Sequence, residues 1–356
     1  MNPTMLLSIV LILGGVPQGQ SKEQSQGQAK EEAVAESRRL ADLGEKFYLR
    51  EKDNRAISSL KKAIKLDPGC IKARYILADI WADRDDIEGA MKEYRKVLEL
   101  DPEHVGALDK LGLLQLEIGQ GEEAIKTFQK ALEVKSDDVE ARTHLGEALE
   151  TLGRLDKAIE QYKKVLETDP DFTAARVGLG IAMSLKGEEA DAIATLQEAA
   201  KRDPESAEPH YHLGVIFETQ QLEEQALREY LKATKLDDRY VLAYHAIGVI
   251  QSLEGDYRSA LKALKKAVEI DPEFADAHFD MGIVLEELDS TSDAAKAYKK
   301  AIKADPKHAD AHGYLGLIYE DAKDLRKAVQ HYRKHVELGG NDPLVQRRLT
   351  ALEKGR

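Results

Sequence analysis

The chain has 356 residues, of which 33% are charged and 6% aromatic, and its formal net charge is −13. This length exceeds the usual single hydrophobic core, so the chain is either divided into domains or built from repeats that add core as they add length. The acidic balance disfavours nucleic acid and anionic membrane surfaces as partners, and the single cysteine, Cys70, excludes an internal disulfide and a cluster of thiolate metal ligands.

The first segment is an uncharged apolar run from Met5 to Gly15, MLLSIVLILGG. Its length matches the core of a secretory signal peptide and falls short of the roughly 20 residues that a membrane span needs. We predict a signal peptide or a short membrane anchor over residues 1–20, and an exported protein, periplasmic or secreted, or one tethered to the membrane. A mis-assigned start or a buried apolar tail is the alternative, and the location is then cytoplasmic.

Residues 18–28 are rich in Gln, Ser and Gly and carry little apolar surface. Such a composition is typical of a flexible linker. We predict a polar linker over residues 21–36 that runs into the first helix, with the folded part beginning near Lys30.

From Ser37 to Asp342 the chain repeats every 34 residues without an insertion, which gives nine copies. Positions in a copy are called slots and are counted from Ser37 in the first. Asp-Pro dipeptides occupy slots 31 and 32 in six copies, beginning with Asp67-Pro68, and Ser136, Asp238 and Gly340 take slot 32 in the other three. All of these residues tolerate a turn or a helix end. A repeat of this period in a chain rich in helix formers indicates a helical solenoid.

Small residues occupy two slots in every copy. Slot 20 is always alanine, and slot 8 is glycine in eight copies and Ala78 in the second. A glycine inside a helix costs about 1 kcal/mol relative to alanine, so its recurrence in one slot needs a structural reason. The close approach of two antiparallel helices supplies that reason.

Large apolar residues recur at helical spacing between these slots, as Leu145, Leu149, Ile159 and Tyr162 do in the fourth copy. Glycines such as Gly153 mark the turn between two helices, and the proline of slot 32 ends the second helix. Each copy is therefore expected to form a helical hairpin.

The pattern of slots 4, 7, 8, 11, 20, 24, 27 and 32 resembles the tetratricopeptide repeat (TPR), and the fourth copy carries it as Leu145, Gly146, Leu149, Ala158, Tyr162 and Pro170. The resemblance implies an all-α fold: a right-handed superhelical α-solenoid of antiparallel helical hairpins, with nine repeats over residues 37–342. The departures from the pattern are Ser136, Asp238 and Gly340 for proline, Leu60, Leu196 and Leu264 for an aromatic residue, and His335 at a small slot.

The last segment, residues 343–356, is predicted to be a capping helix and tail. Asp342 is a candidate N-cap, Pro343 suits the first turn, and Leu344, Leu349 and Leu352 form an apolar stripe. Stacked repeats need an end that tolerates solvent. We expect this helix to seal the last hairpin rather than to bind a partner.

The resemblance also implies where a ligand lies, namely on the inner face of the superhelix at slots 2, 5, 9, 12 and 13 of the first helices. These slots are apolar along the middle and acidic at the edges. Apolar residues outside the packing slots indicate a surface for a hydrophobic segment, although packing on the next repeat is an alternative for any one of them. We predict a peptide groove lined by Tyr75, Leu113, Leu116, Glu147, Glu150, Val177, Ile181, Tyr211, Val215, Glu218, His245, Val249, Phe279, Ile283, Glu286 and Leu317.

These patterns predict a non-catalytic scaffold or adaptor that binds a protein or peptide with apolar anchors. Basic residues of the ligand would meet Glu147, Glu150, Glu218 and Glu286. Some family members clamp a terminal carboxylate with Lys, Arg and Asn in the inner slots, but here the matching positions mostly carry acidic or apolar residues, which disfavours a carboxylate clamp. The alternatives are an accessory subunit of an envelope assembly, export or glycosyl-transfer complex, and a metal or small-ligand binder.

Catalytic and metal motifs are absent from the sequence. The repeats and the cap occupy residues 37–354, and no nucleophile elbow, phosphate-binding glycine loop or HExxH motif occurs. His308 with His312 and His331 with His335 are i,i+4 pairs, a spacing that suits two metal ligands on one helix face. No carboxylate is placed as a third ligand, so we predict no enzyme, no metal site and no cofactor.

Overall fold

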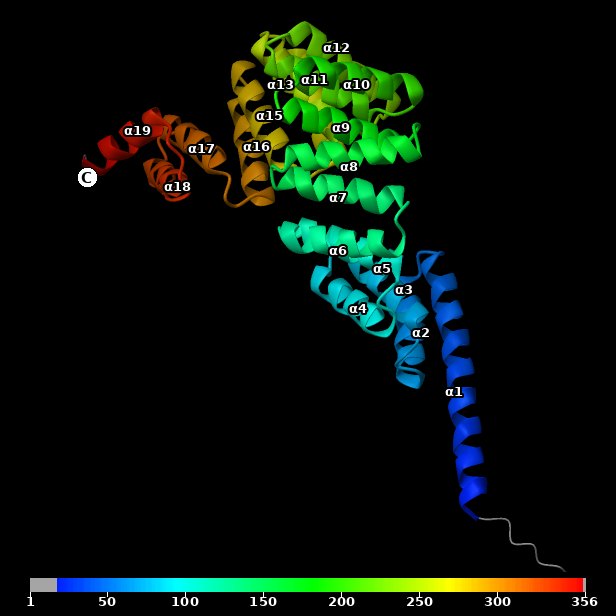
Figure 1. Cartoon of the computed structure of the whole chain (residues 1–356). Coiled ribbons are helices and arrows are strands. Elements are labelled where there is room, and N and C mark those ends of the chain that lie inside the picture. The colour runs from blue at the N-terminus through cyan, green and yellow to red at the C-terminus, as the bar shows by residue number, and fades with distance from the viewer. Residues whose placement is uncertain (1–17, 355–356) are drawn as a thin grey trace, which may run out of the picture. The chain divides into compact units, whose positions relative to one another are not determined.

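The computed structural model describes residues 18–354, which form 19 helices and no strand in that range (Figure 1). The chain divides after Arg154 into two compact units. Each unit consists of helical hairpins stacked in chain order, so the fold is an all-α solenoid. The two units are described separately.

The N-terminal unit contains three hairpins and one further helix. Its helices are α1 (Gln18–Tyr48), α2 (Asp53–Leu66), α3 (Ile71–Asp83), α4 (Ile87–Leu100), α5 (Val105–Glu117), α6 (Gly121–Val134) and α7 (Val139–Thr151). The hairpins pair α1 with α2, α3 with α4, and α5 with α6, and α7 packs on α6. Tyr94 and Phe128, both at slot 24, are among its largest fully buried side chains.

The structure differs from the sequence prediction at the start of this unit. α1 begins at Gln18, so the segment predicted to be a flexible linker is helical. Gln, Lys, Glu and Ala favour helix, and a helix that is already nucleated in a hairpin extends at little cost. Residues 26–32 of this helix are exposed, in keeping with the low apolar content of their sequence.

The apolar run from Met5 to Gly15 lies outside the described residues, and the signal peptide or anchor stays a prediction. Of the helices that the structure describes, none combines the length and the apolar character needed to cross a membrane.

The C-terminal unit contains α8 (Leu155–Thr168), α9 (Thr173–Leu185), α10 (Glu189–Arg202), α11 (Glu208–Thr219), α12 (Glu223–Leu236), α13 (Val241–Leu253), α14 (Tyr257–Ile270), α15 (Ala275–Glu287), α16 (Thr291–Ala304), α17 (Ala309–Asp321), α18 (Leu325–Glu337) and α19 (Pro343–Lys354). α8 packs on α9, and five hairpins follow from α9 to α18. α19 packs on α18, where Val345 is fully buried in a cluster with Ala328 and Tyr332, and Leu349 and Leu352 pack against this cluster.

The slots of small residues have the role that the sequence predicts. Every slot-20 alanine is fully buried between helices. At slot 8, a Cβ added to Gly214 would lie 2.5 Å from the ring of Tyr230, and one added to Gly282 would lie 2.3 Å from the ring of Tyr298. Glycine is therefore required there because the slot-24 ring of the second helix lies directly on the first helix.

The turn inside each hairpin uses one left-handed residue at slot 15. In four repeats this residue is a glycine, for example Gly187 with a φ of 85°. The other repeats place a polar side chain in the same conformation: Glu51, Asp85, Gln221, Asp289 and Lys323. The turn geometry is therefore conserved through the repeats even where glycine is absent.

Candidate functional site: the outward face of the first helices

Five aliphatic residues occupy slot 9 of five consecutive first helices in the C-terminal unit. Slots 4, 7, 8 and 11 of a first helix face its second helix, and at about 100° per residue slot 9 projects from the opposite side. All five side chains are partly exposed. This slot-9 row consists of Ile181 on α9, Val215 on α11, Val249 on α13, Ile283 on α15 and Leu317 on α17.

Aromatic residues at slot 5 lie beside this row. Tyr211 contacts Tyr230, with ring centroids 5.7 Å apart, and Tyr240, at 5.1 Å. Phe279 contacts Tyr298 at 5.7 Å and His308 at 4.7 Å. Both slot-5 rings remain partly exposed, so they can contact a ligand as well as their neighbours.

Val177, the slot-5 residue of α9, does not belong to the site. It is only 2% exposed and packs in a core cluster with Leu196 and Leu213. A valine is too short to extend past this cluster, whereas the tyrosine and phenylalanine in the same slot of other repeats reach the surface. The sequence prediction that Val177 lines the groove is therefore wrong.

The predicted acidic residues of this unit are already engaged within the protein. Tyr230 donates a hydrogen bond from Oη to Glu218 at 2.6 Å, and Tyr298 donates one to Glu286 at 2.5 Å. Burial raises the pKa of Glu286, and the charges of Asp321 and Glu287 raise it further. The tyrosine hydroxyl opposes this shift. Glu218 is exposed and Glu286 is partly exposed.

His245 on α13 joins two neighbouring first helices. Its Nε2 donates a hydrogen bond to Asp280 on α15 at 2.6 Å, and its ring lies edge-on against Phe274 at 4.9 Å. Sequence reasoning singled out His245 but missed Asp280, because the pair joins slot 5 of one repeat to slot 6 of the next. The pair fixes the spacing of the surface around Val249.

The predicted residues of the N-terminal unit form a more polar surface. Tyr75 lies between Tyr94 and His104, and Leu113 and Leu116 are partly buried. Glu147 is exposed and Glu150 is partly buried. Slot 9 in this unit carries Glu45, Asp79, Leu113 and Glu147, so no apolar row comparable to that of the C-terminal unit is present among the described residues.

Asp79 on α3 is a partly buried acidic residue of this unit. It accepts a hydrogen bond from the hydroxyl of Tyr94 at 2.5 Å, and burial raises the pKa of its carboxyl group. Repeat 2 thus places its carboxylate at slot 9, where the other unit has an aliphatic side chain.

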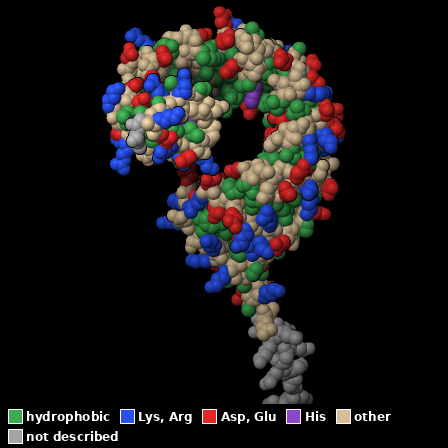
Figure 2. Space-filling view, turned by 90° about the vertical axis from the view of Figure 1, so that its left-hand side faces the viewer, with side chains coloured by type: hydrophobic (Ala, Val, Ile, Leu, Met, Phe, Trp, Pro, Cys, Tyr) green, Lys and Arg blue, Asp and Glu red, His purple; other side chains and the backbone are tan. Residues whose placement is uncertain are grey.

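No group of three His, Cys, Asp or Glu side chains in the described part of the chain is arranged to hold a metal ion. His312 and His331 lie close, with their Nδ1 atoms 3.0 Å apart. Burial lowers the pKa of His331 to about 4, and the neighbouring His312 contributes to this shift. Figure 2 shows acidic and basic side chains interspersed on the face that it draws.

Two solved structures of similar fold cover most of the chain. One is the Cut9–Hcn1 hetero-tetramer of the APC/C, at 17% identity and a TM-score of 0.56, covering 85% of this chain and 59% of that one. The other is the human IFIT1 dimer with PPP-AAAA, at 20% identity and a TM-score of 0.55, covering 91% of this chain and 85% of that one. At these identities they show the fold alone.

YrrB, described as a TPR protein with an unusual peptide-binding site, is 25% identical over 56% of this chain and 98% of its own, at a TM-score of 0.39. No curated protein sequence matches the chain. One family model, described as tetratricopeptide repeat, matches residues 54–105, 110–172 and 280–343. A second model of that description matches residues 151–213, and a TPR repeat model matches residues 253–289. The chain therefore belongs to the tetratricopeptide repeat family.

Proposed function

We propose that the chain is a non-catalytic scaffold whose C-terminal unit binds a peptide or protein segment along the slot-9 row. The repeat family and the fold support a protein-interaction scaffold in general. The observation that carries the specific proposal is the row itself. Five aliphatic side chains occupy the same slot of five consecutive first helices and remain partly exposed. Ile181, Val215, Ile283 and Leu317 also pack against core clusters, and the proposal concerns the apolar surface that they leave exposed.

The ligand is a segment with apolar anchors and with Lys or Arg beside them. The anchors fit between the aliphatic side chains of the row and the rings of Tyr211 and Phe279. The negative charges of Asp321 and Glu287 repel the Glu286 carboxylate and raise its pKa. A cation bound there relieves this repulsion, which favours a basic residue in the ligand.

The test is a pull-down from native extract with the chain and with a variant that carries Ile181→Ser, Val215→Ser and Ile283→Ser. A matched control carries Leu236→Ser, Leu325→Ser and Val336→Ser, which change three exposed aliphatic residues outside the first helices. We expect the same partner to be enriched by the wild type and the control and to be lost with the row variant. Circular dichroism checks that all three proteins are folded. Enrichment that survives in the row variant refutes the assignment.

A further inference from the structure

In several repeats a side chain at slot 23 of the second helix bridges to slot 4 or slot 11 of the first helix. Glu229 pairs with His210 at 2.6 Å, and Thr127 donates to Gln115 at 2.8 Å. The other bridges of this kind join Glu93 to Arg74, Thr195 to Met183, and His331 to His312. The bridge fills the space between the two helices and satisfies a polar atom of the first.

Repeats 7 and 8 lack this bridge because slot 23 is Ala263 in one and Ala297 in the other. Two side-chain polar atoms in the described residues are buried without a hydrogen-bond partner, and each belongs to one of these repeats. They are Oε1 of Gln251, at slot 11, and Nδ1 of His278, at slot 4. The unsatisfied atoms therefore occur where the bridging side chain is missing.

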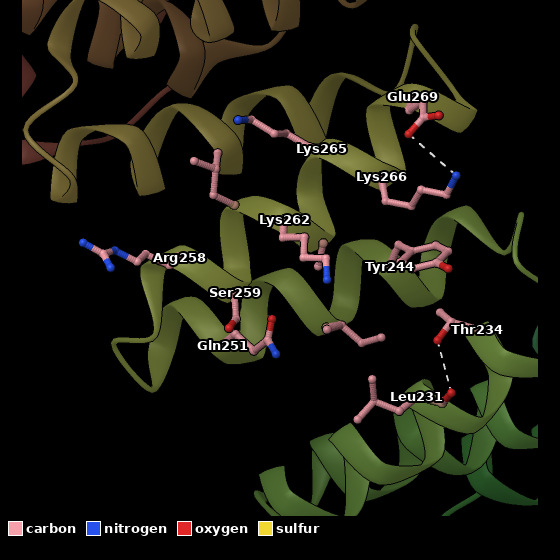
Figure 3. Close-up of a pocket in the computed structure, with 13 residues that line it drawn as sticks. Leu231, Thr234, Tyr244, Gln251, Arg258, Ser259, Lys262, Lys265, Lys266 and Glu269 are labelled. Carbon is pink, nitrogen blue, oxygen red and sulfur yellow. Dashed lines mark hydrogen bonds and ion pairs between the residues drawn. The ribbon is translucent and has the colours of Figure 1, made fainter.

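In repeat 7 the missing bridge coincides with a cavity of about 790 Å³ between α12, α13 and α14 (Figure 3). Its apolar wall includes Leu231, Ile247 and Leu261, and Gln251 lies at its side. The volume is in the range of known ligand pockets. The corresponding cavity beside His278 is smaller, at about 190 Å³.

This cavity is called the α14 pocket below, and its open side is basic. Arg258, Lys262, Lys265 and Lys266 line it at the i, i+4, i+7 and i+8 spacing of one helix face. Glu269 is its only acidic lining residue and pairs with Lys266 at 3.6 Å. In the part of the chain that the structure describes, Arg258 and Lys262 have no ion pair. Basic pairs at these slots recur on other second helices, as Lys299 and Lys300 do on α16, so α14 is distinguished by the cavity beside its basic face.

We propose that the α14 pocket binds an acidic protein segment that carries an apolar anchor. The anchor fills the space beside Leu231, Ile247 and Leu261. Carboxylates of the segment pair with Arg258 and Lys262, and an N–H group donates to the buried oxygen of Gln251. The apolar wall fits an aliphatic or aromatic side chain rather than phosphates, so a protein ligand is favoured over nucleic acid.

The pocket is independent of the slot-9 row. Tyr244, Ile247 and Gln251, which line the pocket, lie on the face of α13 opposite to Val249. The two surfaces also have opposite chemistry, since the pocket is basic and the row has acidic neighbours. One chain can therefore bind two different segments at once, which suits a scaffold.

The probe is a short fluorescent peptide with a Leu-Phe pair flanked by Asp and Glu, and binding is followed by fluorescence anisotropy. Ala263→Thr copies the arrangement of Thr127 and Gln115, so it gives Gln251 a donor and narrows the cavity beside that side chain. Lys265→Glu reverses one charge of the pocket. Its matched control is Lys163→Glu, the same change at the same slot of α8. We expect Ala263→Thr and Lys265→Glu each to weaken binding by about tenfold or more and Lys163→Glu to leave it unchanged.

Two further ligands test whether binding needs the apolar anchor and whether a nucleic acid can replace the peptide. A peptide with Ser in place of the Leu-Phe pair and a single-stranded oligonucleotide are each expected to bind at least about tenfold more weakly. Equal affinity for the wild type and Ala263→Thr overturns the proposal, as does equal or tighter binding of either further ligand. Circular dichroism confirms folding, and Lys265→Glu carries the test if Ala263→Thr does not fold.

Discussion

The buried hydroxyl of Tyr298 donates a hydrogen bond to Glu286 at 2.5 Å, joining slot 24 of the second helix to slot 12 of the first. Tyr230 with Glu218 and Tyr332 with Glu320 repeat this arrangement, at 2.6 and 2.7 Å. The bond closes the hairpin at the end nearest its turn. It also places a carboxylate at the edge of the slot-9 row, so one interaction serves both the fold and the site.

Removing the hydroxyl of Tyr298 tests how much its hydrogen bond to Glu286 stabilises the fold. Tyr298→Phe keeps the ring but leaves the partly buried carboxylate of Glu286 without its donor, so we expect the free energy of unfolding to fall by about 1 to 2 kcal/mol. Urea unfolding monitored by circular dichroism measures the loss. Glu286→Gln keeps an acceptor and should cost less. A Tyr298→Phe variant as stable as the wild type would show that water replaces the hydroxyl without penalty.

Acid should destabilise the C-terminal unit through two histidines. Burial lowers the pKa of His212 to about 4, and that of His331 falls to about 4 through burial and the nearby His312. Between the ordinary histidine pKa of about 6.5 and about 4, the unfolded chain binds more protons than the folded one, so stability falls as the pH falls. The urea midpoint should therefore drop through this window.

Removing one of the two groups should make this dependence shallower. His212→Leu takes away a proton-binding group of the unfolded state, so its urea midpoint should change less between about pH 6.5 and about pH 4 than that of the wild type. A dependence of equal steepness in His212→Leu would contradict the contribution of this histidine.

The turn at slot 15 allows a test in which packing plays no part. A Cβ added to Gly187 meets no atom within 4 Å, yet the φ of this residue is 85°. We expect Gly187→Ala to lower stability by about 1 kcal/mol through backbone strain alone. Lys323, with a φ of 64°, occupies the same slot, and Lys323→Gly should raise the thermal midpoint. Shifts of the same sign in both variants would contradict this explanation.

The hairpins could be predicted from the sequence because each depends on short-range periodicity. Gly282 and Ala294, for example, each occupy a fixed slot at which two helices pack closely. The site depends on contacts that periodicity does not encode. Val177 is buried because of what its neighbours contribute to the core, and the cavity beside Gln251 lies where Ala263 takes the slot of a bridging side chain. The sequence predicts a linker over residues 21–36, where the structure has helix, because composition measures the lack of a core rather than the extension of an existing helix.

The sign of the stability change caused by Gly282→Ala distinguishes helix propensity from packing at slot 8. Propensity alone predicts that Gly282→Ala stabilises α15 by about 1 kcal/mol. The structure predicts the opposite, because the new Cβ would lie 2.3 Å from the Tyr298 ring. Displacing a buried ring costs about 1 to 3 kcal/mol, and the shift also strains the bond to Glu286.

Repeat 2 shows how a hairpin accommodates an alanine at slot 8. It has Ala78 at slot 8, and there Tyr94 bonds to Asp79 at slot 9 instead of to a slot-12 carboxylate. Repeat 8 has Ile283 at slot 9 and offers no such partner. Thermal unfolding of Gly282→Ala should therefore show a lower midpoint, and a higher one would mean that the tyrosine ring moves aside freely and that the slot-8 glycines are not required by packing.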